Sequence, residues 1–500
     1  MGSGKTTAAR SAATALGTEP VDVDREVELR LSKPIAQIFA EDGEPAFRAT
    51  EEEVTIELLR ERPGPAVVSL GGGAVCSGRV RQALGQRQLV VWVDVDPDTA
   101  WARVQGSGRP LASDHATFAR LYAEREPMYA TVADVTVPAE RSEQMAAVLS
   151  ALGDLPAGDR VLWAASASGD YPAYIGRGLL TAGRFWPPQL EGRRFLVTDG
   201  TVGRLYGDAF SGLAARVAVM PGEQSKTVAH AEIVWTELAR AGMTRDDIVV
   251  ALGGGVVGDL AGFCAATYQR GVRYVQIPTT LVAQVDSAYG GKTGVDLPEA
   301  KNYVGAYHQP TAVVADPAVL DTLPEAELAA GYAEVVKTAL IAGGQLWEHV
   351  RGGADPTADE IITACARTKL RIVAQDERDA GLRQVLNLGH TVAHALETVT
   401  GYARYRHGEA VALGLLAALT LSGQDELRRE VHGLLAAKGL PTTLDGAEPE
   451  DVVQATSRDK KRRGLQSVPF VLLDAPGSPR PGCQVPTGEL LAAVRELTSR

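Results

Sequence analysis

The chain has 500 residues, of which 45% are hydrophobic and 22% charged, and its formal net charge is −12. This composition is typical of a soluble globular protein of about three domains, and the acidic balance argues against a nucleic-acid or anionic-membrane partner. The four cysteines form no CxxC pair, no apolar run reaches roughly 18 residues and no signal peptide is visible, so we expect a cytoplasmic protein without disulfides or membrane spans.

The first residues, Met1-Gly-Ser-Gly4-Lys5-Thr6-Thr7, match the second half of the phosphate-binding pattern GxxxxGK[ST]. Backbone N–H groups at a helix start cradle phosphates. Lys5 would reach the β and γ phosphates, and the Thr6 hydroxyl would hold Mg²⁺. An Ala-rich helical pattern at residues 8–16 favours this interpretation over a flexible Gly-Ser start.

Residues 20–150 add carboxylates and a glycine turn. Val21–Asp24 is predicted as a short strand that ends in the two carboxylates Asp22 and Asp24. A buried strand at 66–70 runs into Gly71-Gly72-Gly73, where the bare backbone allows a ligand to approach closely.

The same region carries arginines suited to binding anions. Arg48 is expected in a loop, where its guanidinium suits a bidentate carboxylate contact. Arg109 follows Gly-Ser-Gly, as expected of a mobile lid, and Arg125 offers a further guanidinium. Each arginine alone fits a solvated surface residue, whereas the set in this order indicates a specific site.

In this order, the motifs of residues 1–150 resemble those of shikimate kinase. The resemblance implies an α/β P-loop domain with a parallel sheet, its first strand missing, that transfers the γ-phosphoryl group of ATP to a hydroxyl of shikimate. It places Gly2, Gly4, Lys5 and Thr6 at the nucleotide, Thr6 and Asp22 at Mg²⁺, and Asp24, Arg48, Gly72 and Arg125 at shikimate. Asp24 would orient the hydroxyl, and Arg109 would cover the transferring phosphate.

The first glycine of the phosphate-binding pattern and the strand that feeds it are absent from the sequence. Two interpretations follow: a start codon assigned too late, which we favour because the later kinase motifs are intact, or an impaired kinase. We expect weak or no kinase activity from residues 1–500, and vigorous ATP-dependent phosphorylation of shikimate would contradict this. A noncatalytic binding or dimerisation module is the alternative for this region.

Residues 151–160 form a short Gly- and Pro-containing linker. Residues 161–322 alternate strand-like and helical patterns, which predicts a parallel sheet covered by helices. The expected strands are 195–199, 217–220, 247–252 and 274–278. Residues 323–500 are expected to be mainly helical, with periodic stretches at 326–343, 357–375, 391–399 and 409–421.

The second domain carries a nucleotide-binding signal in Gly253-Gly-Gly-Val-Val-Gly258-Asp259, directly after the strand that ends at Leu252. These glycines would let a pyrophosphate lie against the backbone at a helix start. The pattern is not GxGxxG, so it needs support from other positions. The supporting residues are Asp199 at the end of a strand, Glu223 and Lys226 in PGEQSK, and Thr279 and Thr280 after a strand.

Histidines crowd into a short segment that contains His390, His394 and His407-Gly-Glu409, although the chain has only 8 histidines. Two imidazoles and a carboxylate are the ligand set of a catalytic Zn²⁺. Spacing alone selects His390 with His394, four apart on one helix face, and Glu334 upstream is the candidate carboxylate. Ordinary hydrogen-bonded histidines are the alternative.

Cationic side chains also gather around this segment. Lys337 lies three residues after Glu334 on the same helical face, and Arg383 and Asn387 lie four apart just before the histidines. Each of these residues alone fits a solvated surface position, but their convergence near a metal indicates an anionic substrate, with phosphate and carboxylate as the candidate groups. The cluster comprises Arg270, Lys292, Lys301, Lys337, Lys369 and Arg383.

Residues 160–500 resemble 3-dehydroquinate synthase through a dense set of motifs: GGGVVGD, YQRGVR, PTTLVAQVDS, GGKTGVD, KNYVGAYHQP, GYAEVVK, LRQVLNLGH and RHGEAVA. The resemblance implies an NAD-binding α/β domain (161–322) followed by a helical domain (323–500) that binds metal and substrate, with the site in the cleft between them. It also implies a homodimer, in which Arg270 reaches the phosphate pocket of the partner subunit.

The resemblance assigns Glu334, His390 and His407 to Zn²⁺ (or Co²⁺), and it makes His394 a substrate-site histidine instead of a ligand. The implied catalytic and substrate-binding positions are Asp286, Lys292, Asn302, Lys337, Lys369, Arg383, Asn387, His394 and Lys460. The implied NAD⁺ positions are Asp199, Glu223, Lys226, Gly254, Gly255, Asp259, Thr279, Thr280, Lys301 and Thr322.

The implied reaction converts 3-deoxy-D-arabino-heptulosonate 7-phosphate to 3-dehydroquinate and phosphate. NAD⁺ takes a hydride from a ring carbinol and later returns it, Zn²⁺ polarises that oxygen, and phosphate leaves before an intramolecular aldol step. Two alternatives stay open: a related sugar-phosphate cyclase, and an NAD- and metal-dependent polyol dehydrogenase. The cationic cluster argues against the dehydrogenase, because a neutral polyol needs no such cage.

Overall fold

The computed structural model describes residues 2–60, 65–86, 89–106, 114–153, 155–156, 158–180, 185–298, 300–462 and 469–498, the side chains of 457–462 aside. The described chain divides into two compact units. Unit 1 comprises residues 1–164 and 187–190, and unit 2 comprises residues 165–186 and 191–500. Arg109 lies outside the described residues, and so does the side chain of Lys460.

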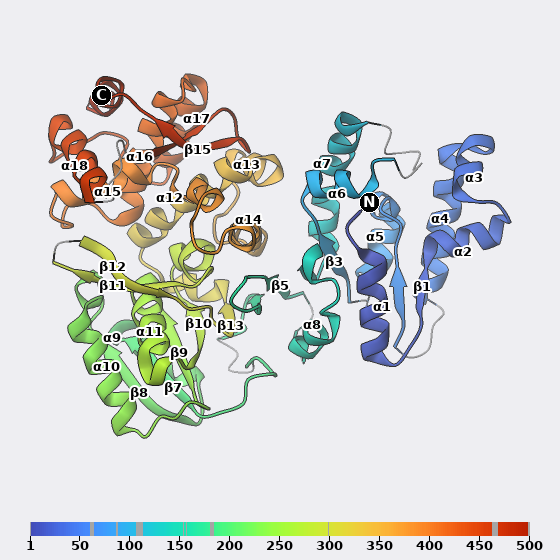
Figure 1. Cartoon of the computed structure of the whole chain (residues 1–500), viewed down its shortest axis with the longest axis horizontal. Coiled ribbons are helices and arrows are strands. Elements are labelled where there is room, and N and C mark those ends of the chain that lie inside the picture. The colour runs from blue at the N-terminus through green and yellow to red at the C-terminus, as the bar shows by residue number, and fades with distance from the viewer. Residues whose placement is uncertain are drawn as a thin grey trace. The chain divides into compact units, whose positions relative to one another are not determined.

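Unit 1 alternates helices with short parallel strands (Figure 1). Strand β1 pairs with β2, β3 pairs with β4, and β4 pairs with β5, and all three pairs are parallel. The described elements are α1 Lys5–Leu16, β1 Pro20–Asp22, α2 Val23–Leu31, α3 Ile35–Glu41, α4 Gly43–Arg60, β2 Val67–Ser69, η1 Ala74–Cys76, α5 Gly78–Leu84, β3 Val91–Asp94, α6 Pro97–Val104, α7 His115–Val132, β4 Val135–Pro138, η2 Ala139–Arg141, α8 Met145–Leu152 and β5 Arg160–Ala164.

Two local predictions for unit 1 are wrong. Arg48 lies on helix α4 and not in a loop, because Glu44 and Glu51, four residues before it and three after it, pair with its guanidinium along one helix face. The strand predicted to end at Asp24 ends at Asp22. The Asp22 side chain accepts from the Asp24 N–H at 3.0 Å and so begins helix α2.

The first part of unit 2 is an α/β layer. Its strands run in the order β6-β13-β10-β9-β7-β8, and each neighbouring pair is parallel. The elements are β6 Tyr171–Ile175, β7 Arg194–Asp199, α9 Gly200–Tyr206, η3 Gly207–Ala209, β8 Leu213–Val219, η4 Glu223–Ser225, α10 Val228–Arg240, β9 Ile248–Gly253, α11 Gly255–Thr267, η5 Tyr268–Arg270, β10 Arg273–Pro278, η6 Ala283–Ser287, β11 Lys292–Leu297, β12 Ala300–Tyr307, β13 Ala312–Ala315 and η7 Pro317–Thr322. Strands β11 and β12 form an antiparallel hairpin.

The chain reverses its direction of travel across this sheet between β7 and β9. From β7 it moves outward to β8, returns to β9 on the other side of β7, and continues to β10. In open parallel sheets, ligands bind outside the carboxyl ends of the strands at such a switch point. Asp199 ends β7 and Gly253 ends β9, so the predicted nucleotide residues lie at this edge.

The second part of unit 2 is mainly helical, as the sequence predicts, and it ends in a β-hairpin and a helix. Helix α16 lies at its centre, and most of its residues are buried. The elements are α12 Glu325–Ala342, α13 Gly344–Arg351, α14 Asp359–Gln375, η8 Leu382–Asn387, α15 His390–Val399, α16 His407–Leu421, α17 Asp425–Ala437, α18 Pro449–Arg462, β14 Pro469–Leu473, β15 Pro479–Gln484 and α19 Thr487–Glu496. The four helices expected between 326 and 421 are confirmed within two residues at each end.

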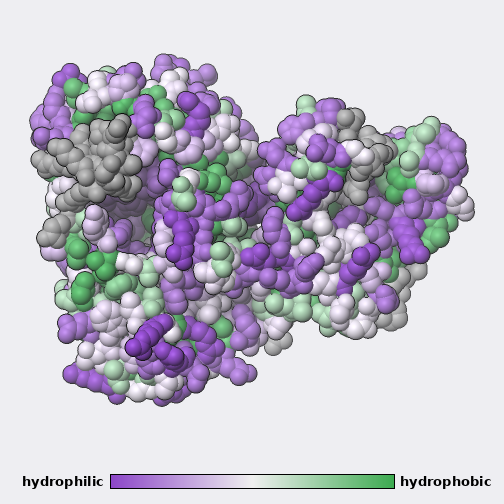
Figure 2. Space-filling view, in the orientation of Figure 1, coloured by the Kyte–Doolittle hydropathy of each residue, from purple (hydrophilic) through white to green (hydrophobic). Residues whose placement is uncertain are grey.

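The visible face of the molecule mixes polar and apolar residues, and the apolar ones lie in small separate groups (Figure 2). Within the described ranges, no helix has both the length and the apolar character needed to cross a membrane.

Asp247 anchors the start of the central strand β9 of unit 2. Its buried carboxylate accepts from Arg193 Nη2 at 2.8 Å and from the Thr244 N–H at 2.7 Å. Burial opposes ionisation, but these donors lower the pKa of Asp247 to about 2. Because the folded pKa lies below the unfolded value of about 3.9, the stabilisation is present above pH ~4 and is lost as the pH falls toward 2.

We therefore expect Asp247→Asn to lower the free energy of unfolding by about 2 kcal/mol at pH 7. Between pH 7 and pH 3 the difference from wild type should shrink by about half, since the carboxyl of the unfolded chain is then largely protonated while the folded one is still charged. Urea unfolding at the two pH values measures this. Asp246→Asn, at the exposed neighbouring carboxylate, is the control and should change little. A destabilisation that is independent of pH would contradict the role of the charge.

Candidate metal, nucleotide and substrate site

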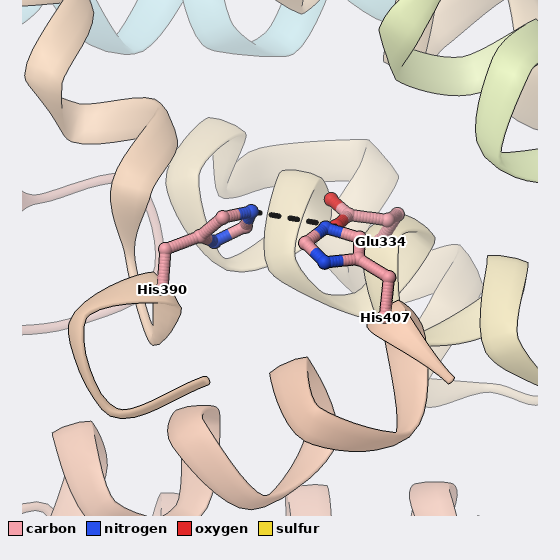
Figure 3. Close-up of side chains that lie close together, drawn as sticks. All are labelled: Glu334, His390 and His407. Carbon is pink, nitrogen blue, oxygen red and sulfur yellow. Dashed lines mark ion pairs between the residues drawn. The ribbon is translucent and has the colours of Figure 1, made fainter. Parts of the chain in front are cut away.

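Three ligand-type side chains from three helices meet in unit 2 (Figure 3). Glu334 comes from the middle of α12, and His390 and His407 are the first residues of α15 and α16. One ligand atom from each lies within 4.8 Å of the others. The Nε2 atoms of His390 and His407 lie 3.6 and 3.3 Å from Glu334 Oε1. This spacing suits one small cation between them.

Glycines beside both histidines allow the helices to approach this closely. A Cβ on Gly408 would lie 1.9 Å from the Ala330 carbonyl oxygen on α12, and a Cβ on Gly414 would lie 2.0 Å from the Gly389 carbonyl oxygen. Gly389, directly before His390, has φ 79°, a left-handed value that side chains disfavour. The backbone contacts of α16 with α12 and with the start of α15 therefore set the positions of the two imidazoles.

Both imidazoles are held with Nε2 toward Glu334. His390 Nδ1 lies 3.2 Å from the Leu388 carbonyl oxygen, and His407 Nδ1 lies 3.3 Å from Glu397 Oε1. An Nδ1–H donated to an oxygen leaves Nε2 unprotonated and available to a metal, which is the usual arrangement of histidine ligands.

The carboxylate is suited to a cation as well. Glu334 is fully buried, and among the described residues neither of its oxygens has a well-aligned hydrogen-bond donor, although Lys337 Nζ lies 2.5 Å from Oε2. Burial opposes ionisation, but Lys337 and the two histidines hold the pKa of Glu334 well below its usual range. A buried anion with unmet acceptor capacity and two imidazole nitrogens fits Zn²⁺ or Co²⁺.

The histidine pair selected by spacing alone is not the pair that faces the carboxylate. The His394 ring centroid lies 5.4 Å from that of His390 and 6.2 Å from that of His407, but His394 is outside the three-residue ligand group. Glu409 is also outside it, because its side chain accepts from the Arg406 N–H and caps α16. His394 therefore borders the ligand group without belonging to it, and its role toward a substrate stays a prediction.

A chain of alternating charges leads away from Glu334. Lys337 Nζ lies 4.0 Å from Asp286 Oδ1, and Lys369 Nζ lies 2.8 Å from the same oxygen. Burial lowers the pKa of Lys369. At Lys337, Asp286 and Glu334 outweigh the effect of burial and raise the pKa. Helix α12, helix α14 and the short π-helix η6 thus bring three of the predicted substrate residues together beside the metal group.

Arg383 is buried near this chain and is oriented by backbone groups. Its Nη2 donates to the Gly290 carbonyl at 3.0 Å, and its Nη1 donates to the Glu377 carbonyl. Gly290 has φ 86°, and a Cβ there would lie 2.7 Å from Arg383 Nη2, so the GGK glycine makes room for the guanidinium. The predicted Lys292 is half-exposed and instead pairs with Asp379 at 2.5 Å.

The predicted nucleotide residues line the carboxyl edge of the sheet. Gly254 is the N-cap of α11, and a Cβ there would lie 2.8 Å from Thr280 Cγ2. The turn after β9 therefore packs closely against the turn after β10. Lys226 pairs with Asp259 at 2.6 Å and also donates to Asn302.

Three further residues predicted to bind the nucleotide contact other residues of unit 2. Asp199 caps α9, Lys301 lies 3.4 Å from Glu223, and the Thr322 hydroxyl lies 2.6 Å from the Tyr206 hydroxyl. The hydroxyl of Thr279 is buried without a partner among the described residues. These contacts place the predicted residues along one edge but leave their roles toward a nucleotide as predictions.

Unit 1 assembles its own polar group. Lys5 Nζ, in the first turn of α1, lies 3.5 Å from Asp24 Oδ2 and 4.0 Å from Asp22 Oδ2. Gly4 precedes this helix with φ 88°, a left-handed value that suits a phosphate-binding turn.

The glycine turn of unit 1 faces the arginines and carboxylates. A Cβ on Gly71 would lie 2.9 Å from Asp24 Oδ1, and a Cβ on Gly73 would lie 2.1 Å from Arg48 Nη1. Arg125 Nη1 donates to the Gly72 carbonyl at 3.5 Å. The predicted shikimate residues Asp24, Arg48, Gly72 and Arg125 are therefore neighbours.

Three carboxylates that pair with predicted site residues were not themselves predicted. Glu397 bridges His407 and Lys301, Asp379 pairs with Lys292, and Glu51 pairs with Arg48. Two of them had a helical signal: Glu397 lies three residues after His394 and seven after His390, and Glu51 lies three after Arg48, so each shares a face with a predicted residue.

The comparisons with known proteins agree with this geometry. Residues 216–330 and 331–462 match the family models for the N-terminal and C-terminal parts of 3-dehydroquinate synthase. The 3-dehydroquinate synthase of Halorhodospira halophila is 45% identical in an alignment of 335 residues that covers 64% of this chain and 94% of that protein. The chain belongs to the 3-dehydroquinate synthase family. Residues 1–155 match the shikimate kinase family model, so a shikimate kinase domain is fused to the synthase.

Further relatives extend the match of the synthase part. The 3-dehydroquinate synthase of Symbiobacterium thermophilum is 46% identical over 316 residues, covering 58% of this chain and 88% of that protein. A solved 2-epi-5-epi-valiolone synthase from Streptomyces hygroscopicus, with NAD⁺ and Zn²⁺ bound, is 26% identical with a TM-score of 0.60 and covers 65% of this chain and 96% of that one. A 2-deoxy-scyllo-inosose synthase with NAD⁺ and Co²⁺ shares the fold, at 23% identity and a TM-score of 0.60, covering 67% of this chain and 99% of that one.

Proposed function

We propose that unit 2 converts 3-deoxy-D-arabino-heptulosonate 7-phosphate to 3-dehydroquinate and inorganic phosphate, with NAD⁺ and Zn²⁺ or Co²⁺ as cofactors. The observation that carries the proposal is the meeting of Glu334, His390 and His407 beside the buried Lys337–Asp286–Lys369 chain, in a member of the 3-dehydroquinate synthase family. A divalent cation next to a cationic cage fits a substrate that is both a polyol and a dianion.

In this proposal Glu334, His390 and His407 hold the metal, and the glycine turn at Gly254 with the nearby threonines holds NAD⁺. When bound, the metal would polarise a substrate oxygen as a Lewis acid, and NAD⁺ would take up and return one hydride without net consumption. Glu334 is fully buried, so its charge interacts strongly with the groups around it.

The cationic residues of the chain bind and orient the substrate. Lys337 and Lys369 are fixed by Asp286, and Arg383 is fixed by two backbone carbonyls, so these groups lose little freedom when an anion arrives. A fixed guanidinium suits the substrate carboxylate, and the lysines suit its phosphate and hydroxyls. Asn302, Asn387, His394 and Lys460 complete the proposed substrate set.

We further propose a homodimer in which Arg270 enters the phosphate pocket of the partner subunit. Gln269 and Arg270 have φ values of 48° and 68°, and two successive left-handed residues without glycine are costly. Arg270 is exposed, and among the described residues it makes no hydrogen bond or ion pair. A strained turn that presents a free guanidinium supports a role outside its own subunit.

Unit 1 is the proposed shikimate kinase, and the chain thereby joins two nonconsecutive steps of the shikimate pathway. The proposal is supported by the family match over residues 1–155 and by the convergence of Lys5, Asp22, Asp24, Arg48 and Arg125. Calorimetric binding of shikimate and of ATP with Mg²⁺ by the 1–500 chain tests this assignment, because binding is measured separately from phosphoryl transfer, for which weak activity is expected. All four cysteines are free, which supports the proposed location in the reducing cytoplasm.

The test of the synthase is metal removal. The purified chain is incubated with the heptulosonate phosphate and catalytic NAD⁺, and release of inorganic phosphate is followed. We expect phosphate release to fall to background after chelation and dialysis, because the bound metal is the proposed Lewis acid. The activity should return when Zn²⁺ or Co²⁺ is added back.

The product identifies the reaction among the alternatives. Dehydroquinate supports the proposal, and a valiolone-type product from a heptulose phosphate without a carboxylate supports the related cyclase. Net accumulation of NADH supports the polyol dehydrogenase. Phosphate release that survives complete metal removal would contradict the metal assignment in all three.

A further inference from the structure

A buried carboxylate on α15 joins the metal ligands to the nucleotide side of unit 2. Glu397 is 2% exposed, and its Oε1 lies 3.3 Å from His407 Nδ1 and 3.4 Å from Lys301 Nζ. We propose that Glu397 is a positioning residue that fixes His407 with its Nε2 toward the metal and links this ligand to Lys301. This inference rests on the metal site of the proposed function and adds a residue that determines how tightly that site binds.

The ring of His407 lies between two carboxylates. Its Nε2 lies 3.3 Å from Glu334 Oε1, and its Nδ1 lies 3.3 Å from Glu397 Oε1. When Nε2 binds a metal, the ring proton must be on Nδ1, and Glu397 is the oxygen positioned to accept it. The carboxylate thereby fixes both the tautomer and the orientation of the ring.

The two histidine ligands are supported in different ways. His390 Nδ1 faces the backbone carbonyl of Leu388, two residues before it in the chain. His407 receives the equivalent support from a side chain on another helix. The orientation of His407 is therefore sensitive to a single substitution, whereas that of His390 is maintained by local backbone.

Lys301 provides the countercharge for Glu397 and extends the link. It lies on β12, and its Nζ also lies 3.4 Å from Glu223 Oε1 and 4.7 Å from the centre of the Tyr402 ring. His407, Glu397, Lys301 and Glu223 thus form a continuous series of contacts from the metal group to the strand edge where the nucleotide is proposed to bind. Burying a carboxylate without partners would be costly, and Glu397 is paired on both sides. Glu397 therefore differs from a solvated surface glutamate.

The test is a Co²⁺ titration of the metal-free full-length chain, followed by the visible absorption of the bound ion. We expect Glu397→Gln to weaken Co²⁺ binding by about 10- to 100-fold relative to wild type, the usual effect of losing such a support. The absorption band should also change, because the imidazole is no longer held in one orientation. Glu377→Gln is the matched control: this carboxylate is also buried, but it accepts from Ser168 and Gln309. Its Co²⁺ affinity and spectrum should equal those of wild type.

A second variant covers the case in which Glu397→Gln does not fold. Glu397→Asp keeps the charge but withdraws the oxygen by one methylene, and it too should bind Co²⁺ more weakly. A purely structural role would lower the unfolding temperature and leave the Co²⁺ affinity and spectrum of the folded protein unchanged. That result, in either variant, would overturn the proposal.

The outcome also separates this inference from the function on which it rests. If the wild-type chain binds no Co²⁺, the proposed metal site is wrong and the inference fails with it. If the wild type binds Co²⁺ and Glu397→Gln binds it equally well with the same spectrum, the metal site stands and only the positioning role is wrong.

Discussion

His407→Ala is expected to remove the bound metal and to reduce phosphate release to background while leaving unit 1 folded. The substitution deletes one of three ligands and leaves Glu334 facing a cavity at the start of α16. Two remaining ligands hold Zn²⁺ far more weakly than three, so the metal content should fall from about one ion per chain to nearly none. Metal analysis of the purified variant and the phosphate-release assay measure the two effects.

Two controls make this result specific. Glu334→Gln removes a different ligand of the same group and should give the same loss of metal. His349→Ala removes an exposed imidazole of α13 and should keep both metal and activity. Circular dichroism and limited proteolysis report whether each unit remains folded. Full zinc occupancy in His407→Ala would show that the ligand assignment is wrong.

Arg48→Lys is expected to weaken shikimate binding to unit 1 by roughly 10- to 150-fold, equivalent to about 1.5–3 kcal/mol for charge-assisted hydrogen bonds. Arg48 Nη1 donates to Glu51 at 2.6 Å, and its Nε and Nη2 each donate to Glu44 at 3.1 Å. These contacts fix the guanidinium plane beside the glycine turn and leave N–H groups for a substrate carboxylate. The single ammonium of lysine cannot replace such a fork.

Calorimetric titration with shikimate in the absence of nucleotide measures this loss, because it reports binding separately from phosphoryl transfer. Arg79→Lys is the matched control, since Arg79 is exposed and pairs with Glu52 on the same unit. Its shikimate affinity should match that of wild type. Equal affinity in Arg48→Lys would exclude Arg48 from the proposed shikimate site.

The order of strands and helices in unit 2 follows directly from the sequence. The strands expected at 195–199, 247–252 and 274–278 are β7, β9 and β10, each longer or shifted by at most one residue at either end. Continuous apolar runs that end in glycine, proline or aspartate are a local signal, because buried parallel strands are apolar on both faces. The glycine turn after β9 is likewise local, and so the nucleotide edge of the sheet was predictable.

In unit 1 the local signals were weaker, and two of them misled. Gly43 and Pro45 predicted a loop around Arg48, yet proline is well tolerated in the first turn of a helix, and α4 begins at Gly43. Asp24 was assigned to a strand because Val21 and Val23 alternate with it, but Asp22 caps a helix there. In both places a helix begins where the local sequence predicts another conformation, a loop in one case and a strand in the other.

The sequence alone determined which residue types were available for a metal: a few histidines and a nearby carboxylate on predicted helices. Helical periodicity describes only one helix at a time, so it paired His390 with His394, and the choice of His407 came from family resemblance. The tertiary structure decided which imidazoles face Glu334, because backbone contacts at Gly408, Gly414 and Gly389 set the approach of α12, α15 and α16. It also decided the place of Glu397, whose partners His407 and Lys301 lie 10 and 96 residues away in the chain.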